Sequence, residues 1–309
     1  MIHIHRILCP IDFSDSSRHA VDHAVAIAKR YESTVTLLHV RPLMSAAAYA
    51  PGIPVATVPL SVATPADHQA VLASMKRFTD TPIATGVPIV FEIGDGNTAS
   101  EILDRSVTMP SDLIIMGTHG RSGVERFMLG SVTEEVIHKA LCPVLTVPPG
   151  IDDVAPTGPL LFTRILCAVD FSDASLHALE YAVSLAQGPD VRLTVMHVVE
   201  VMPPPSSPAE VAGASVHESR ALDAYVATAA QARAEQLERI IPDSVRVQCE
   251  VKTTLAIGRS HREILRVAGE HASDIIVLGA RGFGVAQLLF GSTVHQVVRH
   301  AHCPVLTIR

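Results

Sequence analysis

Short apolar runs alternate along this chain with segments in which apolar residues recur every three or four positions. In the first half, runs with the length and residue types of buried strands lie at 6–12, 34–40, 87–93, 112–116 and 143–147. Between them, Ala20, Val21, Ala24, Val25 and Ala28 share one helical stripe, and further helices are predicted at 66–80, 99–107 and 131–140. This alternation predicts a parallel sheet with helices on both faces.

The second half of the chain repeats the first. The segment Ile7-Leu8-Cys9-Pro10-Ile11-Asp12-Phe13-Ser14 returns 158 positions later as Ile165-Leu166-Cys167-Ala168-Val169-Asp170-Phe171-Ser172. One unit of about 150 residues is therefore duplicated. We predict a first domain at 1–149, a linker at 150–162 and a second domain at 163–309. Within the second domain, strands are predicted at 245–251 and 274–278 and a long helix at 215–240.

Two long segments, 42–65 and 201–213, are rich in apolar residues and proline and carry almost no charge. The first could be a mobile flap, a lid or a partner surface, or an ordered loop without a special role. The segment 201–213 lies at the corresponding position in the second half of the chain.

Composition narrows the class of protein. Charged residues make up 18% of the 309 residues and the net charge is −7, which disfavours nucleic-acid binding because that needs a basic face. No apolar run reaches the roughly 18 residues of a membrane span, and the N-terminus lacks the pattern of a signal peptide. We therefore expect a cytoplasmic protein with no membrane partner, whose five cysteines are reduced and mostly buried.

The candidate binding motif follows the apolar run 112–116. It reads Met116-Gly117-Thr118-His119-Gly120, then nine residues, then Gly130-Ser131 at the start of a predicted helix. Glycines let the backbone approach a ligand closely, and the N–H groups at a helix N-terminus favour an anion. The pattern indicates a phosphate site at the carboxyl end of a parallel strand.

Several polar residues near this motif have two interpretations. Asp12 could accept a hydrogen bond from an amino or hydroxyl group of a ligand, or could cap the helix that follows it. Ser131 and Thr133 could offer hydroxyls to a phosphate, but Ser131 with Glu134 also matches a capping box. Arg121 is either a counter-charge for phosphate or a solvated loop residue.

Catalytic motifs are absent from the sequence. It has no Walker A motif, no Gly-x-Ser-x-Gly elbow and no zinc-protease helix, and no base or nucleophile is evident near the Gly-rich loop. The histidines 295, 300 and 302 are interpreted as helix-face and loop residues rather than metal ligands. We therefore predict no catalytic residue and no metal site built by the protein alone.

The motifs together resemble the universal stress protein family. The opening strand with Asp12, the Gly-x-x-Gly, nine residues, Gly-Ser pattern and the closing Cys-Pro-Val-Leu strand all match it, and both halves are covered. The resemblance implies two tandem Rossmann-like domains of the adenine nucleotide alpha hydrolase-like fold, each with a five-stranded parallel sheet. It also implies pairing of strands 143–147 and 304–308 as an internal pseudo-dimer, with a homodimer as a further possibility.

In the ATP-binding branch of that family, this loop holds the nucleotide. The resemblance assigns the adenine and ribose to Pro10, Ile11, Asp12 and Val40. It assigns the ribose and phosphates to Met116, Gly117, His119, Gly120, Gly130, Ser131, Val132 and Thr133. The expected cofactor is ATP, with Mg²⁺ or Mn²⁺ left open as a companion of the phosphates.

The second half departs from the pattern. Its candidate residues are Asp170, Val198, Gly279, Gly282, Gly291, Ser292 and Thr293, but only eight residues separate Gly282 from Gly291, and Ala168 replaces the proline. Because a preorganised site is sensitive to shifts of about 1 Å, we expect the first domain to bind ATP more readily than the second.

Three functions remain. The first is an ATP-binding regulatory protein of the stress response, which acts through an unknown protein partner rather than by catalysis. The second is a slow ATP hydrolase. The third is a nucleotide-free interaction module or a binder of another small ligand, with 42–65 and 201–213 as contact surfaces.

Overall fold

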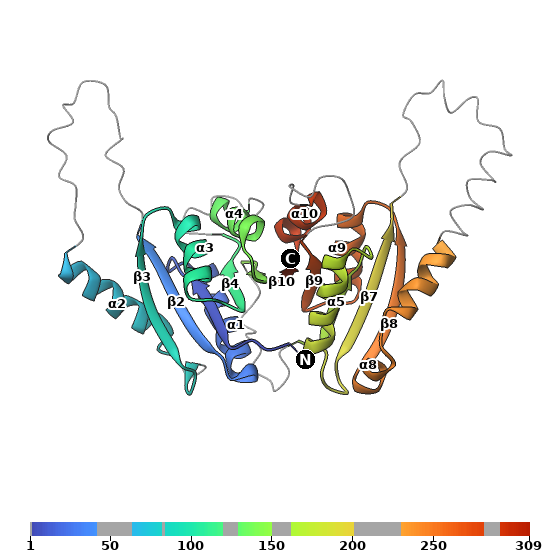
Figure 1. Cartoon of the computed structure of the whole chain (residues 1–309), viewed down its shortest axis with the longest axis horizontal. Coiled ribbons are helices and arrows are strands. Elements are labelled where there is room, and N and C mark those ends of the chain that lie inside the picture. The colour runs from blue at the N-terminus through green and yellow to red at the C-terminus, as the bar shows by residue number, and fades with distance from the viewer. Residues whose placement is uncertain are drawn as a thin grey trace, which may run out of the picture. The chain divides into compact units, whose positions relative to one another are not determined.

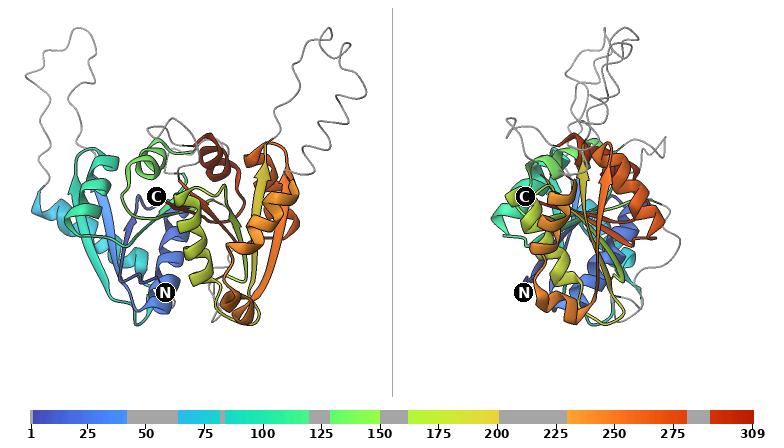
Figure 2. Two further views of the ribbon diagram at one scale, coloured as in Figure 1. Left: turned by 45° about the vertical axis from the view of Figure 1, so that its right-hand side comes forward. Right: turned by 90° about the vertical axis from the view of Figure 1, so that its right-hand side faces the viewer.

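The computed structural model describes residues 2–41, 64–81, 84–119, 129–149, 162–200, 230–280 and 291–309. The chain divides into two compact units, one at 3–157 and one at 158–309 together with residues 1–2. Within each unit, helices cover both faces of a five-stranded parallel sheet (Figure 1, Figure 2). The predicted α/β fold with two similar domains is therefore confirmed.

The first unit has the strand order β3-β2-β1-β4-β5. Its strands are β1 (Arg6–Pro10), β2 (Thr34–Arg41), β3 (Ile89–Asp95), β4 (Leu113–Gly117) and β5 (Val144–Val147). Its helices are α1 (Asp15–Tyr31), α2 (Pro65–Thr79), α3 (Thr98–Thr108) and α4 (Ser131–Lys139). β1 pairs with β2 on one side and with β4 on the other, so the strand order reverses between β1 and β4.

The second unit has the corresponding order β10-β9-β6-β7-β8. Its strands are β6 (Arg164–Ala168), β7 (Arg192–Val199), β8 (Glu250–Ile257), β9 (Ile275–Gly279) and β10 (Val305–Ile308). Its helices are α5 (Asp173–Leu185), α8 (Asp243–Gln248), α9 (Ser260–Glu270) and α10 (Ser292–His300), and residues 230–239 are also helical.

Uninterrupted apolar strands form the core of each unit because both faces of a parallel sheet are covered. Ile114 and Ile115 in β4 and their counterparts Ile276 and Val277 in β9 are completely buried. The predicted apolar stripe of α1 is also buried, and Ser14 caps this helix by accepting a hydrogen bond from the Ser17 N–H.

One predicted strand, 245–251, is wrong. Residues Asp243–Gln248 form the short helix α8, which follows an N-cap at Pro242, and the strand begins only at Glu250. Alternating Val245 and Val247 imitate a half-buried strand, but Val245 is 2% exposed and Val247 is 88% exposed. The local Pro-Asp helix start therefore prevails over the period-two pattern.

Some predictions lie outside the described residues. They include the segment 201–213, nearly all of 42–65 and most of the helix predicted at 215–240. In the part of the chain that the structure describes, no helix is long and apolar enough to cross a membrane.

The cysteines fit their expected role as small apolar core residues. All five are free thiols; Cys9 in β1 and Cys167 in β6 are completely buried, and Cys142 is half-buried. Burial raises the pKa of the Cys142 thiol to about 11 and that of Cys303 to about 12, which keeps both protonated at neutral pH.

Candidate functional site

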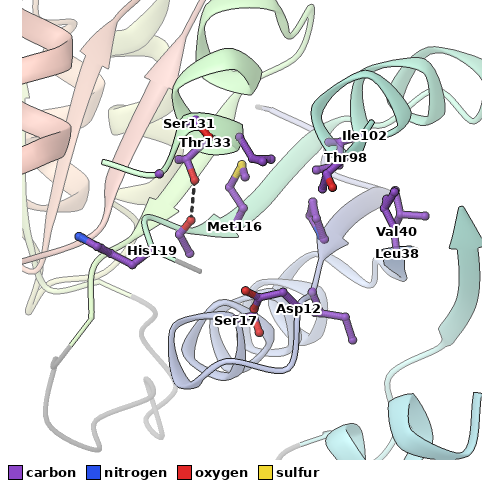
Figure 3. A pocket seen from close by; sticks show the side chains of 15 residues that line it. Asp12, Ser17, Leu38, Val40, Thr98, Ile102, Met116, His119, Ser131 and Thr133 are labelled. Carbon is purple, nitrogen blue, oxygen red and sulfur yellow. Dashed lines mark hydrogen bonds between the residues drawn. The ribbon is translucent and has the colours of Figure 1, made fainter. Parts of the chain in front are cut away.

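A cavity of about 350 Å³ lies at the carboxyl end of the first sheet, where the strand order reverses. This is where open α/β sheets hold their ligands. Figure 3 shows side chains from α1, β2, β4, α3 and α4 around it. The lining residues are Pro10, Ile11, Asp12, Ser17, Leu38, Val40, Thr98, Ile102, Met116, Gly117, His119, Gly130, Ser131, Val132 and Thr133.

The structure thus brings most of the sequence-predicted residues of the first domain to one cavity. Gly120 and Arg121 lie outside the described residues. Four lining residues were not predicted: Ser17, Leu38, Thr98 and Ile102. Leu38 had a signal, because it lies two positions before Val40 on one face of β2. No sequence signal pointed to Thr98 and Ile102, because only the folded arrangement brings α3 to the carboxyl edge of the sheet.

Asp12 is held by a tight turn rather than by helix capping. Its Oδ1 accepts hydrogen bonds from the Ser14 N–H at 3.0 Å and the Ser14 hydroxyl at 2.5 Å, while Ser14 itself caps α1. Between them, Phe13 adopts a left-handed φ of 63°, an unfavourable conformation for an aromatic residue. The capping interpretation of Asp12 is therefore wrong, and its carboxylate lines the cavity.

The His39 side chain packs against this turn. The His39 ring lies 4.7 Å from the Phe13 ring, and its Nδ1 is 2.9 Å from the Ile11 carbonyl oxygen. The second unit repeats the arrangement at Phe171 and His197, with ring centroids again 4.7 Å apart. The left-handed conformation also recurs, since Phe171 has a φ of 64°.

The N-terminus of α4 is open toward the cavity. Gly130 is the N-cap and provides no side-chain hydrogen bond, so of the two interpretations of Ser131 the capping box is wrong. The Thr133 hydroxyl donates instead to the Gly117 carbonyl at 3.0 Å (Figure 3). The N–H groups of residues 131–133 consequently have no partner within the helix, and they can donate to an anion.

Hydrogen bonds fix the base of the Gly-rich loop. The Gly130 N–H donates to the Thr118 carbonyl at 2.9 Å, and the Thr118 N–H donates to the Val147 carbonyl at 3.0 Å. His119 Nδ1 is 2.9 Å from the Thr118 hydroxyl oxygen. Burial lowers the pKa of His119, so its imidazole is neutral at neutral pH.

Three buried polar atoms of the first unit lack a hydrogen-bond partner among the described residues. They are Ser16 Oγ, Arg41 Nη1 and His119 Nε2, each in a residue that lines the cavity or directly adjoins a lining residue in sequence. An unpaired buried polar atom costs about 1–3 kcal/mol, and of these three only His119 Nε2 belongs to a residue that lines the cavity.

Ser16 supplies a stability prediction. Its side chain is 6% exposed, and the second unit has Ala174 at the equivalent position. Ser16→Ala removes the unpaired hydroxyl and is expected to stabilise the first unit by about 1 kcal/mol in urea denaturation. Ser17→Ala is the matched control: it removes a 3.0 Å bond to the Ser14 carbonyl and should destabilise the unit. Destabilisation by both changes would show that Ser16 has a structural partner.

The second unit places its candidate residues in the same way. Asp170 accepts from the Ser172 N–H and hydroxyl, Gly279 ends β9, and α10 begins at Ser292 after an uncapped Gly291. The two ends of the Gly-rich loop lie farther apart in the second unit than in the first. A Cβ on Gly291 would lie 4.0 Å from the Ala280 carbonyl oxygen, against 3.2 Å between Gly130 and the Thr118 carbonyl oxygen. Gly282 lies outside the described residues.

Among the residues that the structure describes, no group of three or more His, Cys, Asp or Glu side chains could hold a metal ion. His300, one of the three histidines considered from the sequence, has its Nδ1 2.9 Å from the Gln296 carbonyl oxygen on its own helix.

Fold and site together define a tandem pair of α/β domains, the first of which has a ligand-sized cavity at the switch point of its sheet. The model of the Universal stress protein family matches residues 3–148 and again 161–309. The chain therefore belongs to the universal stress protein family, with two domains of that family in tandem.

Individual relatives agree with this assignment. A universal stress protein of Methanocaldococcus jannaschii is 35% identical over 144 residues, which cover 46% of this chain and 81% of the relative. One from Mycolicibacterium smegmatis is 26% identical over 307 residues, 98% of this chain and 96% of the relative. The crystal structure of a universal stress protein from Archaeoglobus fulgidus has a TM-score of 0.63 at 22% identity and covers 99% of this chain and 97% of its own.

Proposed function

We propose that this chain is an adenine-nucleotide-binding regulatory protein of the stress response, which holds ATP in the cavity of its first unit. The observation that carries the proposal is the convergence of an apolar slot, an acidic turn and an uncapped helix N-terminus on one cavity. Its volume of about 350 Å³ lies within the usual range for small-molecule sites, roughly 300–1,000 Å³.

Each part of the cavity suits one part of a nucleotide. Ile11, Val40 and Met116 offer apolar surface to the faces of a base. The Asp12 carboxylate is an acceptor for an amino or hydroxyl group. The N–H groups of residues 131–133 at the start of α4 are donors for phosphate oxygens.

Regulation through a partner is favoured over catalysis for a chemical reason. Hydrolysis needs a base that activates water beside the terminal phosphate, and the sequence carries no hydrolase motif that would place one there. In the described lining, Asp12 is engaged by Ser14 and His119 is the other side chain that could serve as a base, so slow hydrolysis is the alternative to regulation. Binding of ATP to the folded state alone would stabilise the first unit and shift it toward a partner-binding state.

Asp12→Asn tests the proposed site. Asparagine keeps an acceptor oxygen for the Ser14 turn but removes the negative charge, so the fold should persist. We expect the affinity for ATP to fall about tenfold, because a hydrogen bond to a charged group contributes roughly 1.5–3 kcal/mol. Equilibrium dialysis with nucleotide-stripped protein measures the change.

Asp170→Asn is the matched control, since Asp170 makes the same turn in the second unit. It should leave the high-affinity binding unchanged. If Asp170→Asn weakened binding and Asp12→Asn did not, the nucleotide would belong to the second unit. If neither mattered, the acidic turn would have no part in binding.

A further inference from the structure

Thr98 lines the cavity on the side away from the open end of α4. It is the first residue of α3, and together with Ile102 it faces the cavity (Figure 3). Ser131 and Thr133 line the α4 side of the same cavity. A ligand whose phosphates lie at α4 would therefore place its other end, the base, near Thr98.

The hydroxyl of Thr98 is not needed to cap its own helix. Asn97 is the N-cap of α3, and its side-chain oxygen accepts from the Ser100 N–H at 2.9 Å. Within the described ranges, the Thr98 hydroxyl has no hydrogen bond to another residue. It is half-buried and available to a ligand in the cavity.

The second unit shows which kind of atom fits beside this hydroxyl. Val199 pairs with Ile257 as Arg41 pairs with Asp95, so Ser260 at the start of α9 corresponds to Thr98. The Ser260 hydroxyl and N–H both donate to Glu200 Oε1, at 2.6 and 3.1 Å. Arg259, which replaces Asn97, provides no cap. A carboxylate oxygen of the chain itself thus accepts hydrogen bonds from the hydroxyl that corresponds to Thr98.

We propose that Thr98 is a specificity-determining residue of the first unit and that its hydroxyl donates to an acceptor on the base of the bound nucleotide. Asp12 accepts from a donor on the same ligand. An aminopurine offers both, a ring nitrogen as acceptor and an exocyclic amine as donor. In the second unit the corresponding hydroxyl of Ser260 already donates to Glu200, so it is engaged within the chain. This inference rests on the proposed function and adds how the base is selected.

Thr98→Val tests the inference, because valine keeps the volume and removes the hydroxyl. Competition against a fluorescent ATP analogue measures the affinities of ATP and of tripolyphosphate, which has the phosphates but no base. We expect Thr98→Val to weaken ATP about five- to tenfold, as a net hydrogen bond of about 1 kcal/mol implies, and to leave tripolyphosphate unchanged. Thr98→Ser retains the hydroxyl and should restore most of the ATP affinity.

The outcomes separate this inference from the proposed function. If wild-type protein binds ATP and Thr98→Val binds it equally well, the role of Thr98 is overturned and the nucleotide site stands. If Thr98→Val weakens ATP and tripolyphosphate by the same factor, the change acts on the shape of the site and the base contact is again overturned. Failure of wild-type protein to bind ATP would overturn both.

Discussion

Replacement of Gly279 by alanine is expected to destabilise the second unit by about 3 kcal/mol, the largest stability effect that this structure predicts. A Cβ at this position would lie 2.7 Å from the Ser175 backbone nitrogen and 2.8 Å from the Ala174 carbonyl carbon. These are backbone atoms in the first turn of α5, so the helix would have to move away from β9. Close packing of α5 on the sheet is therefore what requires this glycine.

Hydrogen exchange measured on peptides from each unit checks the prediction, since it reports the two units separately. Protection should fall in β6–β10 and stay unchanged in β1–β5. Gly269→Ala is the control within the same unit, because a Cβ there meets nothing within 4 Å and alanine favours a helix. Normal protection in Gly279→Ala would mean that α5 packs less closely than described.

Gly117 has the same structural role in the first unit. A Cβ there would overlap Ser16 Oγ and would lie 3.0 Å from the Ser16 carbonyl carbon. The sequence interpretation, in which the glycine lets the backbone approach a ligand, does not account for this contact with α1. Substitutions at Gly117 would disturb folding as well as binding, and other variants are better probes of the ligand.

Ser131→Glu is expected to abolish high-affinity ATP binding, with a loss of at least about a hundredfold. Ser131 is exposed at the first position of α4, where a carboxylate interacts favourably with the helix dipole and the free N–H groups. The fold should therefore be retained or slightly stabilised. The same carboxylate would occupy and repel the phosphate position, and opposing like charges costs several kcal/mol.

Two controls make this result specific. Ser131→Gln has a side chain of similar size without the charge, and it should lose much less affinity. Ser292→Glu places the same charge at the start of α10 in the second unit, where we expect no effect on the high-affinity site. Unchanged ATP binding by Ser131→Glu, measured by thermal shift and dialysis, would exclude α4 as the phosphate site.

Sequence patterns alone predicted much of the fold. Continuous apolar runs located β1, β2, β4 and β5, since strands buried on both faces have no alternation to obscure them. The edge strand β8 was placed too early, because edge strands are partly exposed and α8 mimics their alternation. The return of the Asp-Phe-Ser turn 158 positions later revealed that the unit is duplicated.

The candidate site was predicted less completely, for physical reasons. Residues that follow directly after a strand, such as Asp12 and Gly117, reach the carboxyl edge by their position in the chain. Thr98 and Ile102 reach it only because α3 crosses back toward β4, which no local pattern reveals. The capping interpretations that the sequence left open for Asp12 and Ser131 are wrong, because Ser14 and Gly130 are the actual N-caps.

Calorimetric titration of ATP into the nucleotide-stripped chain of 309 residues tests the proposal of ATP binding most directly. We predict saturable binding of one ATP per chain. Circular dichroism should show the same fold before and after the nucleotide is removed. A correctly folded chain that gives no heat with ATP would contradict nucleotide binding and favour a nucleotide-free interaction module.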